Sequence, residues 1–263
     1  MSAALALKLS LVPALIAAVT LAGRRWGPGV AGWLSAFPVV SGPILFFIAA
    51  EQGPAFAAQA AAATLSAVLA ILVFGVVYAW SATRGSWPAS SALAFLAYAP
   101  AVAALDAWAP PLALSAGTVA VALLLAPLLY PDPPPLAVPG RPARSDIPWR
   151  MVAGALLVLL VTAFASRMGP RLSGLLAMFP VMASVLALFS HRHAGAGFAI
   201  GLLRGMVYGY FAFAGFCLVL ALGLPRLGIT GAFVAATGVA LALQALTRLA
   251  LLRRAQSSSG SSG

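Results

Sequence analysis

Two copies of the triplet Phe-Pro-Val carry the clearest chemical signal in this sequence, at residues 37–39 and 179–181. Proline lacks a backbone N–H and its ring clashes with the preceding turn, so each triplet is expected to break or kink the apolar helix that contains it. A carbonyl group freed in this way is tolerated at membrane depth only where protein buries it or where it lines a wet cavity. The triplets therefore predict either a substrate site or an ordinary proline kink whose backbone bonds to neighbouring hydroxyl groups or water.

Charged and polar side chains form the second group of candidates. Arg204 lies inside an apolar stretch, where a charge is costly unless it pairs, faces water or snorkels to the lipid headgroups. It is interpreted either as a structural arginine or as a group that attracts an anion, with Tyr208 one turn further along. Glu51, the only glutamate, and His193 lie at the ends of apolar stretches, where they either gate a pathway or are simply solvated.

The predicted substrate pathway combines the two triplets with polar residues of other helices: Phe37, Pro38, Val39, Phe179, Pro180, Val181, Arg204, Tyr208 and Gln59. The predicted gate or coupling residues lie at the ends of spans: Arg25, Arg167, Glu51 and His193. The basic residues in these sets, and the partial positive charge of half-helix N-termini, favour an anionic substrate.

Motifs for other chemistry are absent from this sequence. It contains no G-x-x-x-x-G-K-[ST], no H-E-x-x-H and no G-x-S-x-G, and the segment His191–His193 is too short and isolated to predict a metal site. The single cysteine, Cys217, excludes an intramolecular disulfide. We therefore expect no enzymatic activity, no cofactor and no bound metal.

The composition indicates whether these residues lie in water or in a lipid bilayer. Apolar residues make up 63% of the 263 residues and charged residues only 7%, with a mean hydropathy of +1.05. A soluble domain has about 45–50% apolar and about 25% charged residues. The chain is therefore predicted to be an all-α, polytopic membrane protein. Its net charge of +11 does not predict a nucleic-acid partner, because most basic residues lie between apolar stretches and set topology.

Charged, proline and glycine residues divide the chain into nine predicted transmembrane helices: residues 3–23, 29–50, 56–82, 88–107, 111–130, 149–166, 171–190, 196–223 and 228–250. With the N-terminus outside, nine arginines in short loops face the cytoplasm and three face outward. The positive-inside rule then places the C-terminus in the cytoplasm. High alanine and arginine contents are typical of a GC-rich bacterial genome, so the expected location is the bacterial inner (plasma) membrane.

The halves of the chain resemble each other. A shift of 142 residues aligns residues 24–47 with 166–189 and gives nine identities, including Gly-Pro and Phe-Pro-Val. This indicates duplication, with coincidental use of helix-start and kink residues as the alternative. Because five spans separate equivalent helices, the copies are expected to be inverted, as in many secondary transporters. The predicted organisation is repeat 1 at residues 1–107, a linking span and cytoplasmic Pro-rich loop at 108–148, repeat 2 at 149–256, and an appended linker at 257–263.

Glycines recur every four residues in the eighth predicted span, at Gly197, Gly201, Gly205 and Gly209. This spacing produces a flat helix face against which a neighbouring backbone packs closely. We therefore predict that these glycines form a seam between the two repeats and bind no ligand themselves.

The two copies of G-x-L-[SA]-x-F-P-V, Gly32–Val39 and Gly174–Val181, are similar to a segment of known proteins. They resemble the G-G-x-x-A-x-[LF]-P segment of short bacterial inner-membrane proteins of unknown function, which have about half this number of spans. The resemblance implies the fusion of two ancestral halves and names no substrate.

Together these features predict a secondary transporter or facilitator with a site between inverted repeats, for a small or amphipathic anion. A flippase for a lipid-linked phosphate is one alternative, because arginine-rich faces and close glycine seams also suit a headgroup path. A membrane scaffold without transport is another. An enclosed polar pocket at the triplets favours solute transport, a groove open to lipid favours a flippase, and a packed centre favours a scaffold. The expected partners are membrane lipids and the small-molecule or lipid substrate.

Overall fold

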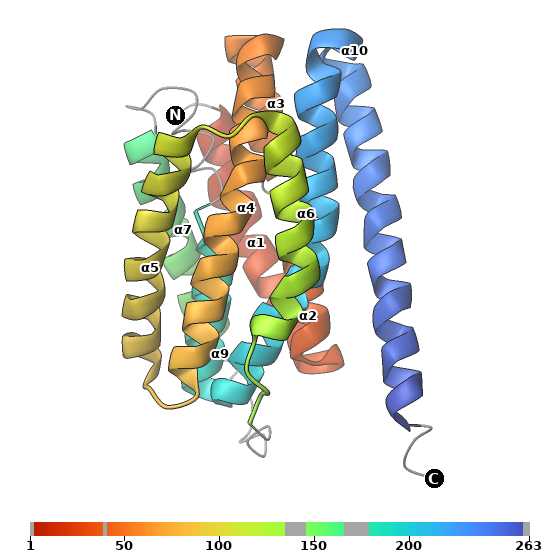
Figure 1. The fold of residues 1–263 in the computed structure, drawn as a ribbon. Helices are drawn as coiled ribbons and strands as arrows, with labels where there is room; N and C mark the ends of the chain where they lie inside the picture. Colours follow the sequence, from red (N-terminus) through yellow and green to blue (C-terminus); the bar gives the residue numbers. More distant parts are fainter. Residues whose placement is uncertain (1–2, 39–40, 135–145, 166–178, 260–263) are drawn as a thin grey trace.

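A computed structural model describes residues 3–38, 41–134, 146–165 and 179–259, which form helices and short connections only. The helices in chain order, labelled as in Figure 1, are α1 (Ala3–Trp26), α2 (Pro28–Ser35), α3 (Ser41–Gln52), α4 (Pro54–Ala82), α5 (Trp87–Trp108), α6 (Leu112–Leu129), α7 (Asp146–Ala165), α9 (Val181–Ala194) and α10 (Ala196–Ser259). The all-α prediction is confirmed for the described residues. The second predicted span, 29–50, is divided into α2 and α3. α10 covers the eighth and ninth predicted spans and continues into the presumed linker, and residues 171–178 of the seventh span lie outside the described part.

Glycines with positive φ angles produce the sharp turns between consecutive helices: Gly27 (87°), Gly53 (88°), Gly195 (85°) and Gly228 (67°). Glycine adopts this region freely because it has no Cβ. Gly228 divides α10 into two helical segments, residues 196–227 and 229–259. Pro28 and Pro54 follow their glycines and open α2 and α4, where a helix needs no N–H donor.

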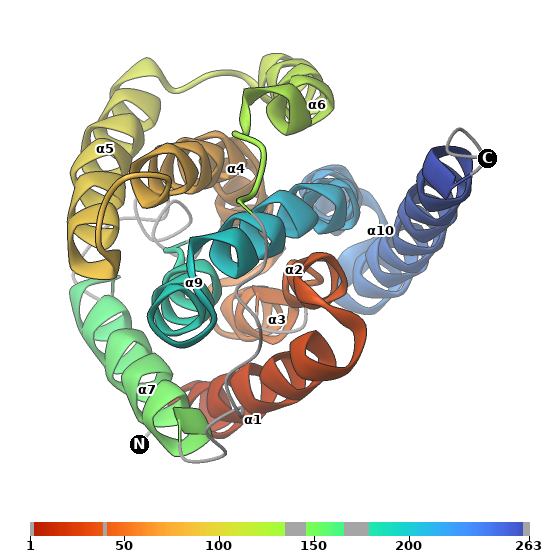
Figure 2. The ribbon, with the colours of Figure 1, turned by 90° about the horizontal axis from the view of Figure 1, so that it is seen from below.

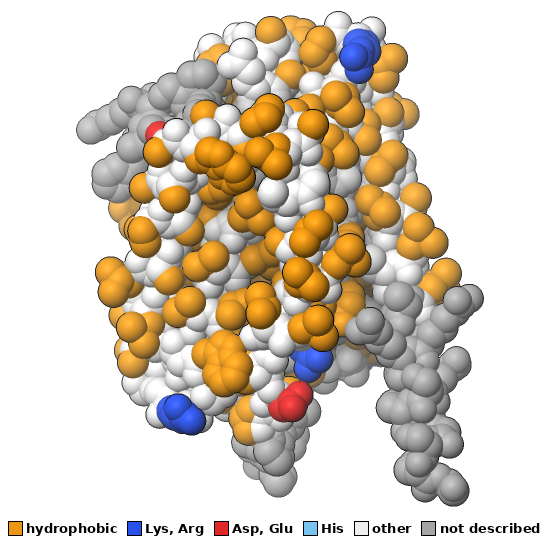
Figure 3. Space-filling model, in the orientation of Figure 1, with side chains coloured by type: hydrophobic (Ala, Val, Ile, Leu, Met, Phe, Trp, Pro, Cys, Tyr) orange, Lys and Arg blue, Asp and Glu red, His pale blue; other side chains and the backbone are white. Residues whose placement is uncertain are grey.

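The outer surface is that of a helical membrane protein. Within the described residues, five helices are long and apolar enough to cross a membrane, namely α1, α4, α5, α6 and α10. Large apolar side chains on these helices are exposed, including Leu96 at 72% and Leu128 at 79%. On the face shown in Figure 3, charged side chains lie near the two ends, and the broad band between them is apolar or uncharged. Such a band matches the hydrocarbon layer of a bilayer.

The bundle is built around α4 and the first segment of α10, which run in opposite directions through its middle (Figure 1). α10 packs chiefly against α4 and α2, and α4 packs also against α5. Seen from below in Figure 2, α5, α7 and α1 border one side, and the second segment of α10 lies at the opposite edge. The start of α1 and the end of α10 lie at opposite ends of the bundle (Figure 1).

Glycines hold the two halves of the chain together at a seam between α2 and α10. A Cβ atom at Gly209 would lie 2.5 Å from the carbonyl oxygen of Trp33, and one at Gly205 would overlap the backbone of Gly29. From the other side, a Cβ at Gly32 would overlap the carbonyl oxygen of Leu202. Side chains would separate these backbones, so the predicted glycine seam between the halves is confirmed at positions 205 and 209.

Candidate functional site

The first Phe-Pro-Val triplet interrupts a helix, as the sequence predicts. α2 ends at Ser35 and α3 begins at Ser41, with Pro38 buried between them. The carbonyl oxygen of Pro38 accepts a 2.9 Å hydrogen bond from the N–H of Gly42, which starts α3. Val39, the third residue of the triplet, lies outside the described residues.

Protein groups satisfy carbonyl oxygens near this break. The Nε2 of Gln244, on the second segment of α10, donates a 3.0 Å hydrogen bond to the carbonyl oxygen of Trp33. The indole Nε1 of Trp33 donates in turn to the hydroxyl of Thr247 at 3.0 Å. The N–H of Phe37 donates to the carbonyl oxygen of Leu34 at 3.3 Å. The end of α2 is therefore anchored to α10, and the carbonyl oxygens of Trp33 and Leu34 have protein partners.

A pocket of about 430 Å³ lies beside the break, between α3 and the two segments of α10. Its lining is almost wholly apolar: Phe37, Phe46, Phe47, Phe216, Phe233, Pro38, Pro43, Gly42 and Thr237. We call it the Phe-lined pocket. Its volume lies within the range of about 300–1,000 Å³ that is usual for small-molecule sites. Phe46 is 43% exposed and Thr237 is exposed, so the pocket opens sideways between α3 and the second segment of α10.

Aromatic rings pack tightly around the second triplet. Phe179 stacks on Phe95 with ring centroids 5.6 Å apart, and Tyr98 meets Phe179 edge-on at 5.8 Å. Phe74 lies 5.1 Å from Phe95. α9 begins at Val181, directly after the second proline. One triplet therefore borders a pocket and the other is packed against aromatic side chains of α4 and α5.

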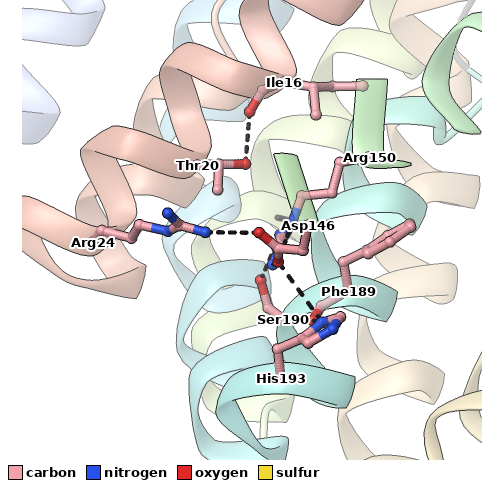
Figure 4. Close-up of polar contacts among 8 residues, drawn as sticks. All are labelled: Ile16, Thr20, Arg24, Asp146, Arg150, Phe189, Ser190 and His193. Carbon is pink, nitrogen blue, oxygen red and sulfur yellow. Dashed lines mark hydrogen bonds and ion pairs between the residues drawn. The ribbon is translucent and has the colours of Figure 1, made fainter. Parts of the chain in front are cut away.

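A cluster of charged groups joins the ends of α1, α7 and α9 (Figure 4). Asp146, 5% exposed, accepts hydrogen bonds from Nη2 of Arg24 at 2.6 Å and from Nη2 and Nε of Arg150 at 2.7 and 3.0 Å. The Nδ1 of His193 lies 3.7 Å from Asp146, and Nη1 of Arg150 donates to Ser190 at 3.3 Å. We call these five residues the ionic cluster.

The ionic cluster carries more positive than negative charge, because two arginines surround one aspartate. Asp146 is the first residue of α7, where a carboxylate also interacts favourably with the helix dipole. The guanidinium of Arg150 lies 5.4 Å from the ring centre of Phe189, a cation–π contact. Nearby, burial lowers the pKa of His191, which favours its neutral form.

The predicted pathway residues are distributed over several places. The pocket includes Phe37 and Pro38, but its lining does not include the second triplet, Arg204, Tyr208 or Gln59. Arg204, with a side chain 37% exposed, lies 4.0 Å from the exposed Asp132, which follows α6. Tyr208 is half-buried and Gln59 is exposed. This pairing favours the structural interpretation of Arg204.

The predicted gate residues also lie in different surroundings and do not form one site. Arg25 is exposed, with its guanidinium 5.6 Å from the ring centre of Trp26, and Glu51 is exposed at the end of α3. His193 alone among the described gate residues joins a charged network, the ionic cluster. Arg167 lies outside the described residues.

Sequence reasoning missed Asp146 and Arg150 as functional candidates. Their spacing of four residues at a helix start predicts an ion pair, which was the available signal. Thr237 and Phe216 of the pocket were missed because a small hydroxyl and one phenylalanine in apolar helices give no local signal.

No protein-family model matches this sequence, and no curated protein or solved structure is significantly similar to it. The fold and the composition define its class, a helical membrane protein with at least five helices suited to crossing a bilayer.

Proposed function

We propose that this membrane protein is a secondary transporter or facilitator for a small amphipathic anion, acting in the bacterial inner membrane with its C-terminus in the cytoplasm. The observation that carries the proposal is the Phe-lined pocket of about 430 Å³ beside an interrupted helix. In secondary transporters, substrate sites lie near the bilayer midplane where helices are broken. The break falls midway between Pro28 and Gln52, near the middle of the second predicted span.

Equivalent turns in the two halves support an inverted repeat as the scaffold. Gly53 and Gly195 are 195 − 53 = 142 residues apart and have φ angles of 88° and 85°. Both accept helix-starting bonds at their carbonyl oxygens, from Ala57 at 3.2 Å and from Ala199 at 3.4 Å. The helices that follow them, α4 and the first segment of α10, run in opposite directions (Figure 1). Inverted repeats in secondary transporters have this relation.

The ionic cluster supports a preference for anions. Arg24 and Arg150 together carry more charge than Asp146. On the predicted topology the cluster lies at the cytoplasmic end, where its contacts tie α1, α7 and α9 together. It is therefore proposed to close that end and to attract anions to it.

A flippase for a lipid-linked phosphate is the second candidate, and the shape of the pocket favours it. The pocket opens sideways past the exposed Phe46 and Thr237, and its lining carries no charged side chain. A lateral opening admits a lipid chain directly from the bilayer, whereas an enclosed polar site would favour a fully soluble anion.

Purified protein in liposomes tests the proposal with two probes. Octanesulfonate, a permanently charged single-chain anion, measures solute uptake, and fluorescent phosphatidylglycerol bleached by dithionite measures lipid transfer between leaflets. Octanesulfonate uptake above the rate of protein-free liposomes, lost on Pro38→Ala with expression and helicity retained, supports the proposal. The alanine is expected to join α2 to α3, since it restores the missing N–H.

Equal rates with and without folded protein for both probes would reject transport and favour a membrane scaffold. Lipid transfer without octanesulfonate uptake would favour the flippase over the transporter.

A further inference from the structure

The 142-residue shift relates the Phe-lined pocket to the aromatic cluster at the second triplet, and each of these sites combines residues of both halves. The cluster consists of Phe74, Phe95 and Phe179, and adding or subtracting 142 converts these positions into those of three pocket residues, Phe216, Thr237 and Phe37. At each site the correspondence joins three separate segments of the chain, two helical segments of one half and the helix break of the other. It therefore relates two sites in space and not only two stretches of sequence.

The pocket exists because aromatic rings present in one half are missing from the other. Phe95 stacks on Phe179, whereas its equivalent is Thr237, which has no ring to place against Phe37. Tyr98, the second ring on Phe179, has Ala240 as its equivalent. A packed protein interior normally has few voids larger than a water molecule. The pocket lies beside Thr237, where the ring of Phe95 has no counterpart, whereas Ala240 is fully buried and lies outside the pocket lining.

The pocket is unfavourable both when it is filled with water and when it is empty. Apolar cavities stay dry, because a water molecule needs two to four polar partners, and the pocket lining offers the Thr237 hydroxyl as its one side-chain polar group. An empty cavity is unfavourable because its lining loses dispersion contacts. The remaining candidate is an apolar group of the bilayer, which reaches the pocket past the exposed Phe46.

From this we infer that the Phe-lined pocket binds one hydrocarbon chain of an amphiphile, which takes the place of the ring of Phe95. The chain stacks along Phe37 and Phe216 and enters between α3 and the second segment of α10. The assignment of this hydrocarbon chain to the transported anion rests on the proposed function. The binding of a hydrocarbon chain in the pocket does not depend on that function.

Photo-crosslinking in nanodiscs tests the occupant. One arm uses phosphatidylglycerol with a diazirine in an acyl chain, and the other uses an alkylsulfonate with a terminal diazirine, so that a bulk phospholipid is distinguished from a single-chain anion. Mass spectrometry locates the label. Labelling of α3 or of the segment around Thr237, above the level on the lipid-facing side of α6, is the expected result in at least one arm.

Two substitutions exchange the residues at the equivalent positions 95 and 237. Thr237→Phe supplies the ring that Phe95 supplies in the other half and is expected to reduce pocket labelling to the level of α6. Thr230→Phe, on the same segment but outside the pocket lining and exposed, is the matched control and retains labelling. Phe95→Thr opens the equivalent space, so new labelling beside Phe179 is expected.

Labelling of the pocket at the level of α6 in both arms, or equal labelling of wild type and Thr237→Phe, would overturn the inference. Crosslinking between two copies of the chain through this opening would also overturn it, since a second copy would then be the occupant.

Octanesulfonate uptake separates this inference from the proposed function. If Thr237→Phe loses both pocket labelling and uptake, the result supports the inference that the bound hydrocarbon chain is part of the transported anion. Normal uptake after loss of labelling overturns the cargo assignment and leaves transport standing. Pocket labelling in a wild-type protein that transports neither probe rejects transport and retains the chain site.

Discussion

Neutralising Asp146 is the sharpest test of the ionic cluster. The carboxylate accepts three hydrogen bonds, one from Arg24 and two from Arg150, and its side chain is 6% exposed. Asp146→Asn keeps the size and planarity of the side chain but removes its charge. Arg150, whose side chain is also 6% exposed, then keeps its charge without the counter-ion.

The expected loss follows from this burial. Removing one member of a buried ion pair costs about 3–5 kcal/mol, because the other charge stays buried and uncompensated. Arg24, 23% exposed, can turn toward water and adds roughly 1 kcal/mol or less. Arg150 keeps its contact with the ring of Phe189, worth about 0.5–1 kcal/mol. We therefore expect Asp146→Asn to lower the free energy of unfolding by about 3 kcal/mol.

A double-mutant cycle measures the pair itself. The free energy of unfolding is obtained by titrating bicelle-embedded protein with SDS and following far-UV circular dichroism. Asp146→Asn, Arg150→Met and the double variant are expected to show a coupling energy of about 2 kcal/mol. Glu51→Gln, an exposed acid-to-amide change at the end of α3, is the control and should change stability by less than about 0.5 kcal/mol. A loss below about 1 kcal/mol for Asp146→Asn, or additive single effects, would refute the reasoning.

Three further substitutions and one control substitution test other contacts. Gly32→Ala puts a methyl group against the α10 backbone and is expected to lower the free energy of unfolding by about 3 kcal/mol, whereas Gly117→Ala, with nothing within 4 Å, should raise it by about 0.5–1 kcal/mol. Gln244→Leu leaves the carbonyl oxygen of Trp33 without its donor and should cost about 1–3 kcal/mol in the same SDS titration. Arg204→Gln is expected to leave octanesulfonate uptake unchanged, because that arginine pairs with an exposed aspartate; loss of uptake would return it to the substrate pathway.

The sequence predicted helix positions and the helix break well, because both depend on local chemistry. Apolar length, proline and glycine determine where a helix starts and stops, and Pro38 interrupts its span where the sequence placed the break. The glycine spacing at Gly205 and Gly209 likewise predicted a close backbone contact. It did not name the partner, since a flat helix face fits any helix, and α2 was identified only by the fold.

The site was less predictable because it depends on contacts between distant residues. The ionic cluster joins Arg24 to Asp146 across 122 residues, and no local pattern pairs them. Arg204 was considered for the pathway because a charge inside a span is unusual, yet Asp132, far away in sequence, lies beside it. The pocket had a weaker signal still, since Thr237 becomes informative only when compared with Phe95 in the other half.

The two ends of the proposed inverted repeat are chemically unequal, and this has a consequence for alternating access. Moving the ionic cluster by 142 residues replaces Asp146, Arg150 and His193 by Ala4, Lys8 and Glu51, so the opposite end has no counterpart of the aspartate at the helix start. A two-state protein populates the state whose contacts are stronger, and a difference of a few kcal/mol makes the other state rare. The state with the cluster intact is therefore expected to dominate at rest. Because Asp146→Asn removes that preference, we expect it to increase labelling of a cysteine at Ser190, which is 3% exposed beside the cluster, in protein that remains folded. Unchanged labelling there would mean that the cluster stabilises the bundle without choosing between its states.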